Sequence, residues 1–327
     1  LQHGMDEEAI QILARLHGDG DVNNALVQAE VAEIRTVIDL ETSSSPSYWK
    51  LLTAKEYRRR TALAMGVQTM QQLSGANIVL YYAAKVFAQT GREGPTASML
   101  ANGINSAIVV VGALSLTIMI DYYGRRKPIY LGPLCMGICL VIVASILVGF
   151  GSPHFNNTTQ AIEFSFSNKS AGEAALSFIF MFQFFFGALS SCVPWTYQSE
   201  VFPLAARARG TSLSTAMNYM TNFWLGLYMP QALNQASWKV YYIFGGINFT
   251  CAIIGFLFYP ETCGRTLEEL DLLFTPDRKT FAFLDKEATR RRPPAQQEIF
   301  GDDPTNAAEK LRQRLLEHGN SEGIPKN

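Results

Sequence analysis

Three amide side chains lie close together in a stretch of the chain that is otherwise almost without polar groups. Gln71, Gln72 and Asn77 occur in ALAMGVQTMQQLSGANIVLYYAA, residues 62–84. An amide that faces hydrocarbon without a hydrogen-bond partner costs a few kcal/mol. We therefore expect these side chains to face a polar cavity or a polar ligand. The stretch indicates a membrane protein that moves or senses something polar.

Acidic and basic residues form a second pattern, because they occur in three sets that each follow an apolar stretch. The first set is DYYGRRK, residues 121–127, in which Gly124 permits a tight reversal of the chain. The second set places Glu200 seven residues before Arg207, and the third lies in PETCGRTLEEL, residues 260–270. We expect the three sets to meet at one membrane surface. The alternative is that the basic residues only set the orientation of the helices in the membrane.

The residue types give little support for an enzyme active site or for a metal site. All four histidines lie outside the apolar stretches, so no nucleophile and base set emerges, and an enzyme is disfavoured. Cys135 and Cys139 have helical spacing, but no nearby histidine or acid completes a metal site. We expect no metal and no cofactor. The arginine run at 290–292 directly follows a membrane domain, which favours a solvated or lipid-facing segment over a nucleic-acid partner.

The elements that must position these residues are long apolar helices. The 327-residue chain carries a formal net charge of −1, and its charged residues collect between the apolar stretches. This pattern is typical of an all-α membrane protein. Each predicted span has close to the roughly 20 residues that a bilayer-crossing helix needs. We expect six transmembrane helices, near residues 61–88, 99–120, 128–150, 174–197, 210–229 and 240–259.

The distribution of lysine and arginine predicts the orientation. Most of these residues fall on the side that holds 50–60, 125–127 and 207–209, and short loops with many Lys and Arg residues stay in the cytosol. We therefore expect a multi-pass protein, with the plasma membrane as the expected site and both termini cytosolic. Residues 1–60 are expected to form cytosolic linker helices, 61–259 the six-span bundle, and 260–327 a cytosolic tail with one short helix. Because the chain begins with Leu1, we expect a fragment.

Together, these motifs resemble the carboxyl-terminal half of a sugar porter of the major facilitator superfamily, in fungal style. The resemblance covers nearly all of residues 5–275. Two departures from the family pattern are Cys263, where a lysine is more usual, and Cys192-Val193 in the approach to Trp195. The motifs that carry the resemblance are QQLSGAN at 71–77 with Tyr81-Tyr82, the turn at 121–126, Pro194-Trp195 with EVFP at 200–203, Asn218 with Asn222, and PET at 260–262 with GRT at 264–266.

The resemblance implies one half of a twelve-helix fold and a role for particular residues. An amide donates and accepts hydrogen bonds together, as a sugar hydroxyl does, and a neutral ligand needs no buried charge. Trp195 would lie against the sugar face, although an interfacial anchor stays possible. Asn222 is given a structural role, and Tyr81 and Tyr82 are either gate or packing residues. The implied substrate-binding set is Gln71, Gln72, Asn77, Asn105, Trp195 and Asn218, and the implied cytosolic gate is Asp121, Arg125, Arg126, Glu200 and Arg207.

The function that we expect is therefore transmembrane transport of a sugar or related polyol by alternating access. The expected partners are the sugar, the lipid bilayer and a missing amino-terminal half. Two alternatives stay open. One is a transporter-like sugar sensor, and the other is an inactive truncated remnant.

Overall fold

The fold was analysed in a computed structural model, which describes residues 6–17, 20–44, 46–77, 79, 95–156, 161–166, 168–236, 238–265, 267–275 and 280–290. The helices are α1 (Asp6–His17), α2 (Ala25–Ser44), α3 (Tyr48–Thr53), α4 (Lys55–Leu73), α6 (Pro95–Tyr123), α7 (Arg126–Phe150), α8 (Lys169–Phe185), α9 (Val193–Glu200), α10 (Leu204–Ala236), α11 (Trp238–Phe258), α12 (Leu267–Leu273) and α13 (Lys286–Thr289). A π-helix, η1 (Phe186–Ser190), joins α8 to α9, and a 3-10 turn, η2 (Ala282–Leu284), precedes α13.

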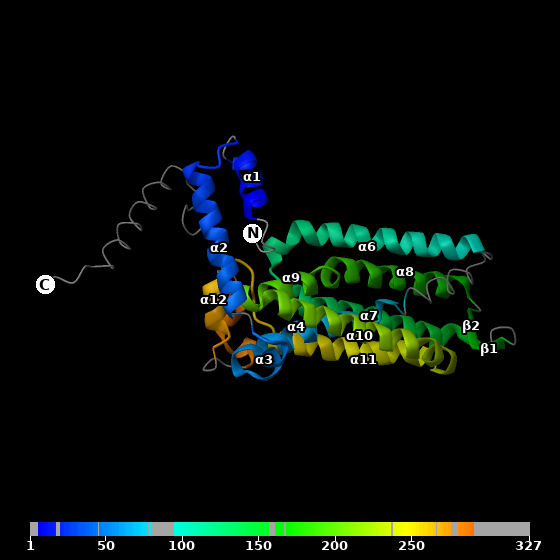
Figure 1. Ribbon diagram of the computed structural model, residues 1–327. Coiled ribbons are helices and arrows are strands. Elements are labelled where there is room, and N and C mark those ends of the chain that lie inside the picture. Colours follow the sequence, from blue (N-terminus) through cyan, green and yellow to red (C-terminus); the bar gives the residue numbers. More distant parts are fainter. Residues whose placement is uncertain are drawn as a thin grey trace, which may run out of the picture.

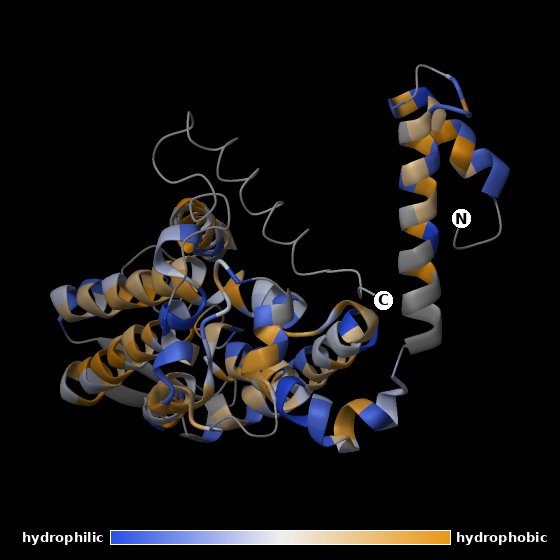
Figure 2. Cartoon of the chain, turned by 90° about the vertical axis from the view of Figure 1, so that its left-hand side faces the viewer, coloured by the Kyte–Doolittle hydropathy of each residue, from blue (hydrophilic) through white to orange (hydrophobic). Residues whose placement is uncertain are grey.

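The long helices lie side by side in one bundle (Figure 1). Within it, α7 packs against α8 and α11, α4 packs against α10, and α6 packs against α8 and η1. One end of the bundle carries two short strands and is called the hairpin end. The other end carries α3 and is called the α3 end. The helices α1 and α2 form a separate pair that stands across the α3 end, with its own small core around Val27 and Val31 (Figures 1 and 2).

The expectation of an all-α protein needs one correction, because two strands occur at the hairpin end. β1 (Gly151–Asn156) pairs antiparallel with β2 (Ala161–Phe166), and Gly151 faces Phe166 across the ladder. We expected this segment to be a loop. AIEFSF alternates apolar and polar residues, which favours a strand, but six-residue runs are too short to be recognised securely from sequence. Apart from this hairpin, the described elements are helical.

Three helices among the described residues are long and apolar enough to cross a membrane. They are Arg126–Phe150, Trp238–Phe258 and the continuous segment Lys169–Glu200, which contains α8, η1 and α9. They coincide with the predicted spans at 128–150, 240–259 and 174–197. A shorter apolar helix covers Asn102–Ile118, inside α6. The count of six spans therefore stays a prediction.

The predicted first span is interrupted at the glycine of its amide motif. α4 ends at Leu73, and Gly75 adopts a left-handed φ of 87° that a side chain would disfavour. The structure thus shows a local break of the helix at this position. Tyr81, Tyr82 and the expected tail helix lie outside the described residues.

Candidate functional site

The amides of the first predicted span form a hydrogen-bonded cluster between α4 and α10. Gln72 Nε2 donates to Asn218 Oδ1 at 2.9 Å, and Asn218 Nδ2 donates to Gln71 Oε1 at 3.0 Å and to Gln68 Oε1 at 2.7 Å. Gln72 Oε1 accepts from Asn222 Nδ2 at 3.0 Å and from Asn77 Nδ2 at 3.3 Å. We call these six residues, Gln68, Gln71, Gln72, Asn77, Asn218 and Asn222, the amide cluster.

The helical spacing explains why these side chains meet. Gln71 and Gln72 lie one turn after Gln68 on the same face of α4. Asn222 likewise lies one turn after Asn218 on α10. From Thr61, where the predicted span begins, Gln71 lies about 15 Å along the helix, which is near the middle of a bilayer core about 30 Å thick. The cluster therefore lies at the depth where a carrier would hold a polar ligand.

Exposure increases across the amide cluster. Gln68 is fully buried and Asn218 is 2% exposed, whereas Gln71, Gln72 and Asn222 are half-buried and Asn77 is exposed. The buried members position the others, since their hydrogen bonds are made inside the bundle. The exposed edge offers both donors and acceptors without any charge, which suits a neutral ligand that carries hydroxyls.

A further contact ties the amide cluster to the π-helix. Gln71 Nε2 donates to the backbone carbonyl oxygens of Ser190 and Ser191, at 3.1 and 2.7 Å. These carbonyls lie where η1 passes into α9, and a π-helix leaves backbone groups available in this way. Trp195 lies one turn further along α9 and is 40% exposed. The structure thus joins the amide motif to the segment that carries Trp195.

Asn105, by contrast, is not brought to the amide cluster. It lies on α6, is fully buried, and neither of its amide atoms has a hydrogen-bond partner among the described residues. Sequence reasoning also missed Gln68, although it lies one turn before Gln71 in the same apolar stretch and could have been found there. Asn222, which we expected to have a structural role, bonds Gln72 on the neighbouring helix α4.

The second predicted site is a set of charged residues at the α3 end of the bundle. Arg125 Nε donates to Glu200 Oε1 at 3.0 Å, and Arg125 Nη1 donates to Asp121 Oδ1 at 3.1 Å. The same Nη1 lies 3.0 Å from Cys263 Sγ, and Thr262 Oγ1 donates to Glu200 Oε2 at 2.6 Å. The three charged sets recognised in the sequence therefore meet. We call the group the latch, and it consists of Asp121, Arg125, Arg126, Glu200, Glu261, Thr262 and Cys263.

Glu261 is the residue of the latch that sequence reasoning did not assign. Its carboxylate accepts hydrogen bonds from the backbone amides of Arg125, Arg126, Thr262 and Cys263, at 2.8, 3.2, 3.1 and 3.1 Å. Two of these amides lie at the amino terminus of α7, where the helix dipole favours a negative charge. The side chain bridges the chain after α11 to the start of α7.

Burial and charge act together on the arginines of the latch. Burial disfavours the charged form of Arg125, but Glu200, Cys263 and Asp121 outweigh it and raise the pKa of the guanidinium. The side chain of Arg126 donates to the carbonyl oxygens of Tyr259 and Phe256 at 2.9 and 2.8 Å. Both arginines keep their charge at neutral pH, because a guanidinium group is not deprotonated in proteins.

Arg207 differs from the other expected gate residues. It lies in the first turn of α10, and its buried Nε has no hydrogen-bond partner in the part of the chain that the structure describes. No ion pair joins it to Glu200 among those residues. The structure therefore assembles Asp121, Arg125, Arg126 and Glu200, but leaves Arg207 apart from the latch.

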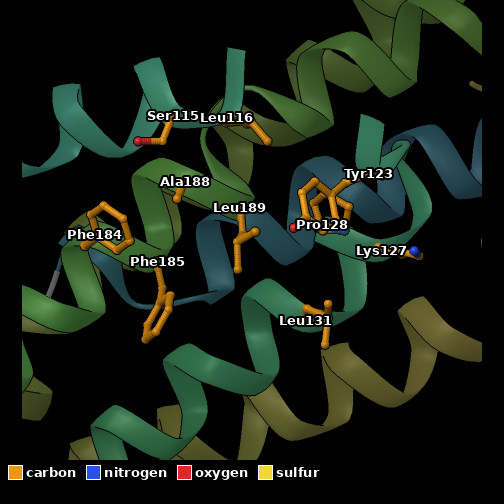
Figure 3. A pocket seen from close by; sticks show the side chains of 10 residues that line it. All are labelled: Ser115, Leu116, Tyr123, Lys127, Pro128, Leu131, Phe184, Phe185, Ala188 and Leu189. Carbon is orange, nitrogen blue, oxygen red and sulfur yellow. The ribbon is translucent and has the colours of Figure 1, made fainter. Parts of the chain in front are cut away.

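One apolar pocket can be set aside as a ligand site. It lies between α6, α7 and the α8–η1 segment, with Phe184, Phe185 and Leu189 in its wall (Figure 3). The hydroxyl of Ser115 in this wall donates to Val111 of its own helix. This pocket therefore offers almost nothing that could recognise a polar solute, unlike the amide cluster.

Similarity to known proteins identifies the family of the chain. The family model described as "Sugar (and other) transporter" matches residues 1–274. A glucose transporter of the major facilitator superfamily from Aspergillus flavus is 35% identical over 82% of the chain. A high-affinity glucose transporter from Kluyveromyces lactis is 32% identical over 83% of the chain. The chain spans 51% and 50% of these two relatives, which is about half of their length.

Solved structures show the same fold. The proton:xylose symporter XylE, bound to 6-bromo-6-deoxy-D-glucose, aligns with 84% of the chain and 53% of its own length, at a TM-score of 0.59 and 23% identity. An inward-open xylose transporter XylE from Escherichia coli aligns at a TM-score of 0.56 and 25% identity, over 82% of the chain and 50% of its own length. The match of the family model over most of the chain shows that this protein belongs to the sugar transporter family.

Proposed function

We propose that this chain is the carboxyl-terminal half of a sugar carrier that works by alternating access. In this proposal it has six spans and both termini in the cytosol, and an amino-terminal half completes the pathway. Its family, and the glucose transporters of which it spans about half, support this proposal. Transport, not catalysis, is the activity that such a family membership favours.

The amide cluster is the observation that carries the proposal. Its exposed edge, formed by Asn77, Gln72 and Asn222, would bind sugar hydroxyls, and Gln68 and Asn218 hold that edge in place. Each amide–hydroxyl bond contributes about 0.5–1.5 kcal/mol net, so a few bonds give the weak binding that lets a carrier release its cargo. Trp195 would cover one face of the sugar ring. Asn105 is buried in this structure and does not form part of that edge.

The latch would hold the α3 end closed in one of two states. Arg125 ties the end of α6 to Glu200 on α9, while Glu261 ties the segment after α11 to α7. When the helix ends of this half move apart as the cavity opens to the cytosol, these contacts would break as a group. Since exposed ion pairs are worth about 1 kcal/mol or less, the buried Glu261 contributes most to the bias between the states.

The test is glucose uptake in a host that lacks its own hexose carriers. Three forms are compared at matched surface expression: the chain alone, the chain with the amino-terminal half of the Aspergillus flavus relative, and the latter with Gln72→Ala. We expect uptake only from the second form. Gln235→Ala, an exposed amide in the last turn of α10, is the matched control and should leave uptake unchanged. Absence of uptake from the second form would contradict the proposal and favour a sensor or an inactive remnant.

A further inference from the structure

A long groove with an apolar part and a positively charged part runs along the side of the bundle. Its apolar part, which we call the shaft, has a volume of about 880 Å³ and lies between α4, α10 and α11. It continues at the α3 end into a polar part of about 390 Å³, which we call the head site. The two parts share Ala62, Leu63 and Phe258, so they form one continuous groove.

The sequence of α4 builds both parts from one stripe of residues. Lys55, Arg58 and Arg59 line the head site. The shaft follows on the same face at helical spacing, with Ala62, Leu63, Gly66, Thr69, Met70 and Leu73. The amide cluster uses other positions of α4, and none of its members lines the groove. The groove is thus separate from the proposed sugar site.

The threonine hydroxyl groups in the wall of the shaft are already hydrogen-bonded to the backbone, so they are not free to bind a ligand. The hydroxyl of Thr69 donates to Met65 O, and that of Thr250 donates to Gly246 O, each within its own helix. Its lining residues extend over about 16 Å of α4 and about 22 Å of α11. One leaflet of a bilayer core is about 15 Å thick, so the shaft is long enough to hold an acyl chain.

The head site concentrates positive charge, and its cations make no ion pair among the described residues. Lys55 and Arg58 are exposed, and no carboxylate of the described residues lies within ion-pair distance of these two or of Arg59. Arg59 donates to the carbonyl oxygens of Leu273 and Thr280, at 3.4 and 3.1 Å. Burial lowers the pKa of Arg59, and the opposing influence of Tyr197 and of the Asp285 carboxylate does not fully offset it. An anion at this position would supply the missing compensation.

From this juxtaposition of three cations with an apolar shaft of leaflet length, we propose that the groove binds an anionic phospholipid. Its phosphate lies at Lys55, Arg58 and Arg59, and an acyl chain lies along α4 and α11. In the orientation proposed above, the head site faces the leaflet in which anionic lipids are concentrated. The bound lipid would fasten α4 to α11 at the α3 end of the bundle.

Native mass spectrometry in a neutral detergent tests the head site. Phosphatidylserine, phosphatidylcholine with the same acyl chains, and the soluble glycerophosphoserine are each titrated into the full chain. We expect phosphatidylserine to bind at least about tenfold more tightly than phosphatidylcholine, because each cation near a headgroup gives roughly a fivefold gain. Lys55→Gln with Arg58→Gln should abolish this preference. Lys169→Gln with Lys239→Gln removes the same charge at the hairpin end and should leave it intact.

A second pair of variants tests the shaft. A β-carbon on Gly246 would meet no atom within 4 Å, and Gly246 lines the shaft, so Gly246→Leu places a bulky side chain in the open space of the shaft. It should weaken the binding of both phospholipids about tenfold or more. Gly103→Leu is the matched control, since Gly103 is equally open but lies on α6, away from the groove. Unchanged lipid binding by Gly246→Leu would overturn the proposal and leave the groove to another occupant, such as the other half of the carrier. Equal binding of glycerophosphoserine would overturn it also.

Discussion

Replacing Glu261 with Gln is the sharpest test of the latch, because the change keeps the size of the side chain and removes its charge. The Glu261 carboxylate is 3% exposed. Its Oε1 accepts from the backbone N–H groups of Arg125, Thr262 and Cys263, and its Oε2 accepts from that of Arg126. Glutamine has one acceptor oxygen, so its NH2 group must face at least one of these donors.

The expected loss follows from these contacts. A buried N–H group left without an acceptor costs about 1–3 kcal/mol. The remaining bonds change from charge-assisted to neutral and lose about 1 kcal/mol each, and the favourable charge at the start of α7 disappears as well. Because such effects are not additive, we expect Glu261→Gln to lower the free energy of unfolding by about 3–5 kcal/mol, as breaking a buried charged contact typically does.

The assay is unfolding in mixed micelles by titration with sodium dodecyl sulfate, followed by far-ultraviolet circular dichroism. Glu173→Gln is the matched control, since Glu173 is exposed on α8 near the hairpin end. The control should change the free energy of unfolding by less than about 0.5 kcal/mol. If Glu261→Gln costs less than about 1 kcal/mol, the carboxylate does not hold the latch as the structure indicates.

The same titration tests three further changes. Gly124→Ala should cost about 1–3 kcal/mol, because Gly124 has a left-handed φ of 78° and a β-carbon would overlap the Glu261 carboxylate; an equal cost in a Glu261→Ala background, where the carboxylate is removed, would show that the overlap is unimportant. Asp121→Asn should cost about 1 kcal/mol or less, since the Asp121 side chain is 76% exposed, whereas Glu200→Gln should cost more; the reverse order would contradict the assigned contacts. Asn218→Leu should cost about 2–4 kcal/mol, because it leaves three glutamines without their shared partner, and a neutral effect would show that the amide cluster is not cooperative.

The helices of the fold were the part most readily predicted from the sequence. The spans at 128–150 and 240–259 match α7 and α11, since long apolar runs bounded by charged residues leave few alternatives. The helices α6 and α10 extend well beyond their apolar parts. Backbone hydrogen bonds continue a helix into polar residues, and hydropathy does not detect such residues as part of a span. The β-hairpin and the end of α4 at Leu73 depend on local turn geometry, which periodicity does not encode.

The residue types of the candidate site could be predicted from the sequence, but the hydrogen bonds among them could not. The types of Gln71, Gln72 and Asn77 indicated a polar site, but the sequence could not show that Asn218 is a shared partner of three glutamines. Such pairing depends on how α4 and α10 are rotated against each other. The latch shows the same limit, because only the fold reveals that Glu261 caps α7 and that Arg207 lies apart.

The central claim is that the exposed edge of the amide cluster binds the sugar, and equilibrium binding of labelled glucose to the assembled carrier tests it most directly. Asn77 is the best probe, since it is exposed and makes one weak bond within the cluster, so its loss should hardly affect folding. We expect Asn77→Ala to weaken glucose binding about 2- to 13-fold, the equivalent of about 0.5–1.5 kcal/mol, with the free energy of unfolding unchanged. Unchanged glucose affinity in both Asn77→Ala and Gln72→Ala would contradict the account.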